Sequence, residues 1–367
     1  MVSCQQALDL YEHNSLNDLA ARAAETTNCL HDPAIRTYVI ERNINYTNVC
    51  RTHCRFCAFS VTQSNSNAYV LTPEQIAAKI EPLIALGGTQ ILLQGGCHPD
   101  LPFEFYEKML TNIKTRFPRL HIHAFSPPEI TYFAEKYELT IPEVIRRLRH
   151  AGLDTIPGGG AEILVDRVRK LISPAKCSTD QWLEVMRQAH RLGMYTTATM
   201  MFGHVETIPE RIEHLDRLRT LQAESLQYRK KNPQAAYFTA FTCWPFQPGT
   251  TRLARFFRFD PQSDANRRPD QLLLAGAYQQ LKMNALARLF LDNIPNQQAS
   301  WVTQGPKIGQ LSLRAGCNDF GSLMMEENVV AAASTTFQLQ LAQLRQLIAA
   351  VGFKPVQRDY YYNLLDA

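Results

Sequence analysis

The sequence lacks a hydrophobic run long enough to cross a bilayer, and its first residues lack the apolar core of a signal peptide. We therefore expect a cytoplasmic protein without a membrane partner. Charge of one sign is also scarce, because the 367 residues carry a net charge of only +4. So small an excess predicts no nucleic-acid partner.

A paired cysteine framework is missing as well. The nine cysteines are an odd number, and three of them are bunched. Secreted disulfide scaffolds instead have even numbers of spaced cysteines. We expect free thiols in a reducing compartment.

What the sequence has is an alternation of strand-like and helix-like segments. Residues 1–36 are expected to form a helical extension, with Ser15 as a helix cap. About eight strand–helix units follow in residues 37–367, which predicts one α/β domain, a (β/α)8 barrel with an extra C-terminal segment. A doubly wound open sheet is the alternative. The expected strands lie in 37–50, 89–96, 120–129, 153–162, 194–206, 236–249, 299–306 and 313–322, the expected helices in 71–88, 103–117, 141–151, 178–192, 208–228, 270–290 and 333–351, and a long irregular loop in 255–269.

Three cysteines follow the first expected strand in the stretch NVCRTHCRFCAF. Thiolates are soft ligands that favour zinc, copper(I) or iron–sulfur clusters. A four-iron cluster usually takes four thiolates, so three would leave one iron open. His53 lies inside the loop, which keeps a Cys3His zinc site as an alternative. The other cysteines are expected to be core or surface residues, although Cys97 directly follows a glycine turn.

The spacing Cys50-x3-Cys54-x-Phe56-Cys57 resembles the motif of the radical S-adenosylmethionine superfamily. The resemblance implies a [4Fe-4S] cluster held by the three cysteines, with S-adenosylmethionine on the open iron. It also implies that Phe56 lies near the adenine. Gln94, Gly95 and Gly96 match the position of the superfamily's glycine motif, but the acid that usually ends this motif is absent here.

Further stretches resemble one branch of that superfamily, which serves menaquinone synthesis by the futalosine route and synthesis of the deazaflavin of coenzyme F420. These stretches include HIHAFSPPEI, PGGGAEILVDRVR, TTATMMFGHVET and RAGCNDFGSLMMEENVV. The resemblance is strongest to the enzyme that cyclises dehypoxanthine futalosine. Aminofutalosine synthase and the tyrosine-using subunit of the deazaflavin synthase are the alternatives.

The implied cyclisation begins when a 5′-deoxyadenosyl radical takes the ribose C4′ hydrogen. The carbon radical then closes a ring onto the benzoate, and an electron and a proton leave. The enzyme would need an external one-electron donor such as flavodoxin or ferredoxin. Two alternative hypotheses fall outside the radical enzymes: a non-catalytic iron–sulfur electron carrier and a zinc-stabilised sugar-binding barrel.

Active-site groups in such a barrel lie where strands end. Ser126 and Glu162 are expected to contact ribose, because the glycines before Glu162 let the backbone approach a ligand. His204 and Asp319 are expected near the substrate as catalytic candidates with Glu162, and Glu206 among the cofactor-binding residues. His123 and Glu129 are further candidates for the base. Arg314 and Lys307 are candidates for binding the benzoate carboxylate.

Overall fold

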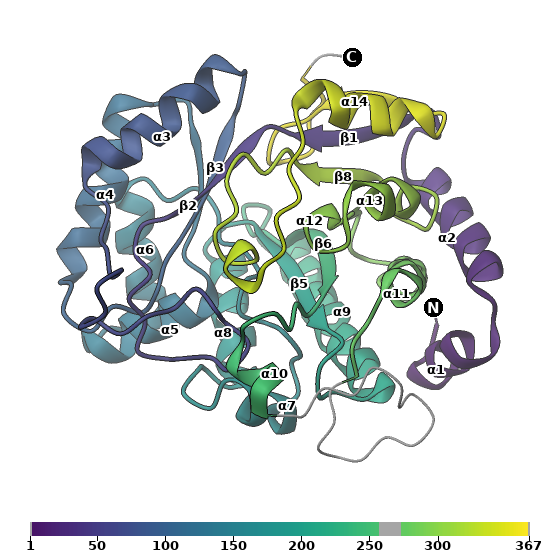
Figure 1. Ribbon diagram of the computed structural model, residues 1–367, viewed down its shortest axis with the longest axis horizontal. Coiled ribbons are helices and arrows are strands. Elements are labelled where there is room, and N and C mark those ends of the chain that lie inside the picture. The colour runs from purple at the N-terminus through teal and green to yellow at the C-terminus, as the bar shows by residue number, and fades with distance from the viewer. Residues whose placement is uncertain (1, 257–272, 366–367) are drawn as a thin grey trace.

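The computed structural model describes residues 2–256 and 273–365, so most of the expected loop 255–269 lies outside the described residues. Parallel strands form the centre of the molecule (Figure 1). Their bounds are β1 Ile35–Val39, β2 Glu41–Asn45, β3 Gln90–Gln94, β4 His121–Ala124, β5 Thr196–Phe202, β6 Phe238–Pro245, β7 Asn296–Gln298, β8 Asp319–Ser322 and β9 Lys354–Gln357.

The strand order runs around a barrel. One sheet has the order β2-β3-β4 and the other β5-β6-β7-β8-β1-β9. Parallel bridges from His123 to Thr155 and from Ile156 to Thr196 join β4 to β5. On the other side, β1 and β2 are consecutive pieces of one extended segment, in which β1 pairs with β8 and β2 pairs with β3. The expected (β/α)8 architecture is therefore confirmed, and its fourth strand is reduced to Thr155 and Ile156.

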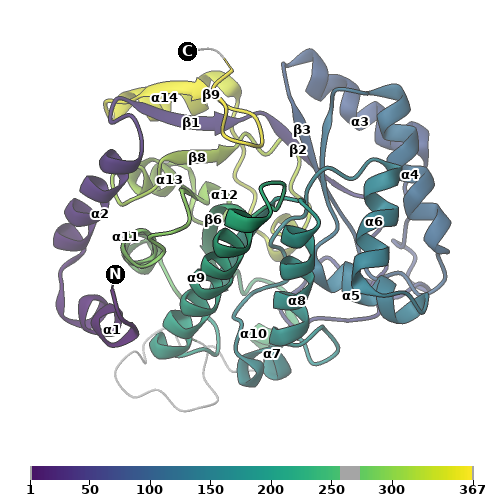
Figure 2. The ribbon, with the colours of Figure 1, turned by 180° about the vertical axis from the view of Figure 1, so that it is seen from behind.

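Helices surround the strands, with α3, α4 and α6 on one flank and α1, α2 and α11 on the other (Figures 1 and 2). Many of these helices begin at an N-cap residue whose side chain accepts a backbone hydrogen bond, such as Ser15 and Thr72. Their bounds are α1 Cys4–His13, α2 Leu16–Leu30, α3 Pro73–Ala85, α4 Phe103–Arg116, α5 Pro127–Lys136, α6 Ile141–Ala151, α7 Asp166–Ile172, α8 Thr179–Arg191, α9 Ile208–Lys231, α10 Arg252–Phe256, α11 Ala277–Phe290, α12 Trp301–Gln304, α13 Pro306–Ser312 and α14 Leu341–Ala350. None of the described helices is long and apolar enough to span a membrane.

Two expectations about single elements were wrong. The stretch 299–306 is not a strand, because β7 ends at Gln298 and residues 301–304 form α12. The Trp301 indole N–H donates to the Ser322 carbonyl at 2.9 Å, so this short helix is fixed by packing against β8. The last helix is also shorter than 333–351 and is followed by β9, which the sequence pattern did not reveal.

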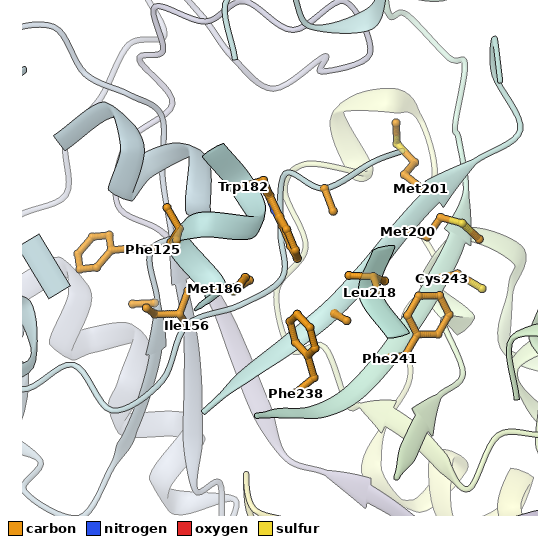
Figure 3. Packing of buried hydrophobic residues seen from close by; sticks show 14 of the residues in the cluster. Phe125, Ile156, Trp182, Met186, Met200, Met201, Leu218, Phe238, Phe241 and Cys243 are labelled. Carbon is orange, nitrogen blue, oxygen red and sulfur yellow. The ribbon is translucent and has the colours of Figure 1, made fainter. Parts of the chain in front are cut away.

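The hydrophobic core lies between the strands and the outer helices (Figure 3). Trp182 of α8 and Phe238 of β6 are fully buried, with their rings stacked at a centroid distance of 6.3 Å. The Trp182 indole N–H also donates to the carbonyl of Gly159 at 3.2 Å. The packed core thereby fixes the loop that carries the three consecutive glycines.

Candidate functional site

The cysteine loop follows β2 at the carboxyl end of the strands. Bridges from Thr47 to Val70 and from Val49 to Val61 close it. Cys54 is buried, whereas Cys50 and Cys57 are half-buried. The Thr52 hydroxyl lies 2.9 Å from Cys50 Sγ and 3.6 Å from Cys54 Sγ. The loop therefore gathers soft sulfur ligands at the rim of the barrel.

The thiols of this loop have different environments. A side-chain hydrogen bond from Cys97 lowers the pKa of Cys50 to about 5, against the effect of burial. Burial raises the pKa of Cys54 to about 11. Burial alone would lower the pKa of Lys176, but the acidic groups of Cys54 and Glu162 beside it raise this pKa above its ordinary value. An ammonium group thus stands beside the buried thiol.

The glycine turn after β3 packs directly against this loop. A Cβ atom at Gly96 would lie 2.1 Å from the Val49 carbonyl oxygen and 2.7 Å from Cys50 Cβ. A Cβ atom at Gly95 would lie 2.5 Å from the ring of Tyr46. Both positions exclude a side chain, so the turn can lie against the cysteine loop only with glycine.

A cavity of about 370 Å³ opens beside the loop and extends into the barrel. Of the residues singled out in the sequence, Phe56, Gln94, His123 and Glu162 line it. Apolar walls come from several strands and from α12. These wall residues include Leu92, Met201, Trp244, Phe246, Trp301 and Val302.

Glu162 is one of the acidic residues that line this cavity. Its backbone has a φ of 42°, which is uncommon for a residue with a side chain. Lys176 Nζ donates to Glu162 Oε1 at 3.0 Å, and Arg169 Nη1 lies 4.0 Å from Oε2. Glu162 Oε2 is buried without a hydrogen-bond partner among the described residues. A ligand hydroxyl would satisfy this oxygen.

Ser126 and Glu129 hydrogen-bond to each other, and Glu129 also contacts the glycine turn. They form the capping box of α5, with the Ser126 hydroxyl 2.7 Å from Glu129 Oε2. Glu129 Oε1 accepts hydrogen bonds from the Tyr46 hydroxyl and the Gly95 N–H. The carboxylate therefore positions the turn.

His204 and Glu206 lie outside the cavity lining and are fully buried. The backbone N–H groups of residues 203 and 204 and the Arg211 guanidinium donate to Glu206. Burial alone would raise the pKa of Glu206, but the neighbouring His204 and Arg211 and the hydrogen bonds it accepts hold it well below its usual range. This cluster fixes the loop between β5 and α9.

Asp319 also lies behind the lining. Its carboxylate accepts hydrogen bonds from Arg358 at 2.6 and 3.0 Å and from the Thr37 hydroxyl at 2.5 Å. Arg358, and not Asp319, faces the cavity.

Polar side chains of β2 and β3 that were not predicted from the sequence also line the cavity. Glu41, Asn43 and Gln90 line the cavity, and Glu327 from the loop after β8 joins them. The Asn43 amide N–H donates to Glu327 and the Gln90 amide N–H to Glu41, at 3.0 and 2.5 Å. The amide oxygens of Asn43 and Gln90 have no partner among the described residues. Strict alternation along residues 41, 43 and 45 was the signal that these side chains share one face.

No three His, Cys, Asp or Glu side chains in residues 2–256 and 273–365 converge where one metal ion could sit. An iron–sulfur cluster does not need such convergence, because its thiolates bind separate iron atoms. Three thiols on one rim loop, beside a glycine turn without side chains, fit a cluster better than a single ion.

Family models divide the chain into two regions. Residues 44–218 match the radical S-adenosylmethionine superfamily. Residues 235–367 match the region described as the CofH/MqnC C-terminal region. The chain therefore belongs to the radical S-adenosylmethionine superfamily and is an enzyme. Membership implies a [4Fe-4S] cluster and S-adenosylmethionine as cofactors.

Curated relatives include proteins named for two different activities. A cyclic dehypoxanthine futalosine synthase from Halalkalibacterium halodurans is 43% identical over 99% of this chain and 91% of its own length. A 5-amino-6-(D-ribitylamino)uracil–L-tyrosine 4-hydroxyphenyl transferase from Synechocystis is 41% identical over 90% of this chain and 83% of its own. Among solved structures, a methylornithine synthase is similar in fold, with a TM-score of 0.68 at 17% identity over 97% of this chain and 94% of that one.

Proposed function

We propose that this enzyme cyclises dehypoxanthine futalosine in menaquinone biosynthesis. The observation that carries the proposal is the 43% identity, over nearly the whole chain, to a relative named for that reaction. The cavity supports it, because both polar and aromatic side chains line it. A sugar joined to a benzoate presents the same two kinds of surface.

Cys50, Cys54 and Cys57 would hold the cluster and leave one iron for S-adenosylmethionine. When bound, the two cofactors would supply the radical chemistry that removes the C4′ hydrogen of the ribose. Phe56 lines the cavity beside the cysteine loop, with Lys176 Nζ 4.9 Å from its ring centroid, and is suited to contact an adenine. An external one-electron donor such as a flavodoxin or ferredoxin would reduce the cluster.

The chain's own task is to hold the substrate and to exclude water. Glu162 Oε2 and the amide oxygen of Asn43 are buried acceptors suited to sugar hydroxyls. Trp244 and Trp301 give the aromatic ring an apolar wall. Holding the C4′ hydrogen and the ring in one fixed arrangement is the main contribution, since positioning can supply several kcal/mol, roughly 7–11 in favourable cases.

His123 is the cavity group best placed to accept the final proton. Its Nδ1 lies 2.8 Å from the Thr155 hydroxyl, and its Nε2 lies 3.5 Å from that of Thr197. Burial lowers the pKa of His123 well below its ordinary value, so the candidate role rests on its position in the cavity.

The second candidate is transfer of a tyrosine-derived group to a ribitylaminouracil. The 41% identity to a transferase named for that reaction favours it. Both candidates share the cofactors, so only the substrate separates them.

An anaerobic assay tests the proposal. Reconstituted enzyme with S-adenosylmethionine and dithionite receives dehypoxanthine futalosine in one tube and L-tyrosine with the ribitylaminouracil in another. We expect a product lighter by two hydrogens in the first tube only, together with 5′-deoxyadenosine. Product in the second tube alone would establish the transferase.

The variant Cys54→Ala tests the cluster ligands in the same assay. It should lose bound iron and 5′-deoxyadenosine formation together. Cys29→Ala, at an exposed cysteine outside the loop, is the matched control and should keep both. Turnover by Cys54→Ala would refute the ligand assignment.

A further inference from the structure

The proposed substrate carries an aromatic carboxylate, which requires a cation or several hydrogen-bond donors when buried. Neither cation expected from the sequence lines the cavity. Arg314 donates to the Val351 carbonyl near the surface, and Lys307 is exposed near the start of α13. Among the described residues, Arg358 is the only Lys or Arg that lines the cavity.

Arg358 is 1% exposed and directly follows β9. Its backbone N–H donates to the Tyr38 carbonyl at 2.9 Å, which fixes it beside β1. Nε and Nη2 donate to Asp319, and Nη1 donates to the Asp359 carbonyl at 2.9 Å. A guanidinium has five N–H groups. Three contacts are therefore made within the chain, and two N–H groups remain for a ligand.

The neighbouring groups also provide donors. The Tyr362 hydroxyl lies on the same cavity wall and accepts a hydrogen bond from Gln298 Nε2 at 3.0 Å, so its own proton is free to be donated. The Arg358 guanidinium carbon lies 4.0 Å from the Tyr362 ring centroid. Glu41 lines this end as well, and burial raises its pKa above the ordinary value. Asp319 lies behind Arg358.

The depth of the cavity suits a ligand with two polar ends. Glu41 pairs with Gln90 where β2 and β3 begin, and Asn45 pairs with Gln94 where they end. Four residues of strand separate these levels, which is about 13 Å. Phe56 and Glu162 lie at the upper end with the cysteine loop, whereas Arg358 lies at the lower end, beside β1. A sugar at the upper end would leave the aromatic acid pointing toward Arg358.

We propose that Arg358, with the Tyr362 hydroxyl, binds the carboxylate of the aromatic substrate at the lower end of the barrel and so sets its orientation. The inference deepens the proposed function and rests on it for the identity of the substrate. The competing explanation is a purely structural Arg358, which ties β9 to β8 through Asp319.

A comparison of the acid substrate with its methyl ester separates carboxylate binding by Arg358 from a purely structural role. Wild-type enzyme, Arg358→Lys and Arg358→Gln receive dehypoxanthine futalosine or its benzoate methyl ester, and both kcat/KM and calorimetric affinity are measured. Wild type should favour the acid by about 100-fold, since buried donors left unpaired reject a ligand that lacks the matching group. Arg358→Gln should reduce this preference to a few-fold, and Arg358→Lys should keep part of it.

Asp319→Asn is the matched structural control. It removes the ion pair but keeps the guanidinium, so it should lower the melting temperature and retain the preference for the acid. Equal losses of kcat/KM and affinity for acid and ester in Arg358→Gln would overturn the proposal.

If the wild type makes 5′-deoxyadenosine but leaves dehypoxanthine futalosine unchanged, the proposed function fails. The calorimetric comparison then uses L-tyrosine and tyrosinamide, and equal binding of both by wild type and Arg358→Gln would overturn the role of Arg358 as well.

Discussion

Several buried charges of this enzyme support the site from behind its lining. Glu206 receives hydrogen bonds from two backbone N–H groups and from Arg211, and none of these groups faces the cavity. Glu129 likewise receives hydrogen bonds from Tyr46 and Gly95 and positions the glycine turn. Strand-end carboxylates in such a barrel can therefore serve stability and positioning as readily as chemistry.

The variant Glu206→Gln should lower the free energy of unfolding at pH 7 by about 3 kcal/mol or more, because it leaves Arg211 buried without a counter-charge. The pKa of Glu206 is held below its usual range, so its contribution is full above the unfolded value of about 4.3 and is lost as pH falls through the folded pKa. The difference in free energy of unfolding between wild type and Glu206→Gln should therefore be smaller in acid than at pH 7. Urea unfolding of both proteins at pH 7 and in acid measures this difference. Glu213→Gln, at an exposed pair with Arg217, should change little.

The variant Gly96→Ala should reduce iron binding. Its methyl group would collide with the Val49 carbonyl and Cys50 Cβ, which displaces the first cysteine of the loop. Iron content after anaerobic reconstitution measures the effect. Gly276→Ala is the control. A Cβ atom at Gly276 would meet nothing closer than 3.6 Å, so this variant should bind iron as wild type does. Equal iron in both variants would show that the tight approach at residue 96 is dispensable.

At the scale of elements, helix starts follow local signals. Thr72 caps α3 with a complete capping box, and Pro73 occupies its first turn. The strand 299–306 was mispredicted because its apolar residues suit either a strand or a buried helix. The hydrogen bond from Trp301 to Ser322, distant in sequence, accompanies the helical choice.

The variant Thr72→Ala should lower the free energy of unfolding by about 1 kcal/mol, since it removes the side-chain acceptor for the Gln75 N–H. Thr115→Ala, at an exposed position inside α4, should be neutral or slightly stabilising because alanine is the better helix former. Chemical denaturation of both variants tests the difference. Equal destabilisation would mean that tertiary packing, and not the cap, sets the start of α3.

At the scale of the whole molecule, the barrel depends on contacts between distant parts of the chain. β1 near the N-terminus pairs with both β8 and β9 (Figure 2). β9 also brings Arg358 to Asp319. The C-terminal segment thus completes both the sheet and one end of the cavity.

Ending the chain after Gly352 should therefore destabilise the whole barrel. The truncation removes the partner of β1 and leaves Asp319 buried without its cation, which alone costs about 3–5 kcal/mol. We expect a large drop in soluble yield and in melting temperature. Leu364→Ala, which shortens an exposed side chain of the same segment, should behave like wild type. A truncated chain that melts at the wild-type temperature would contradict this account.

The sequence by itself determined the alternating strands and helices, the helix caps and the cysteine spacing, because each depends on residues within one or two turns of chain. It also indicated Phe56, Gln94, His123 and Glu162, which line the cavity. Only the tertiary structure decided that His204, Glu206 and Asp319 lie behind the wall, and that Arg358 faces the cavity. Those placements depend on pairing between segments hundreds of residues apart, such as β1 with β9, and no local pattern encodes them.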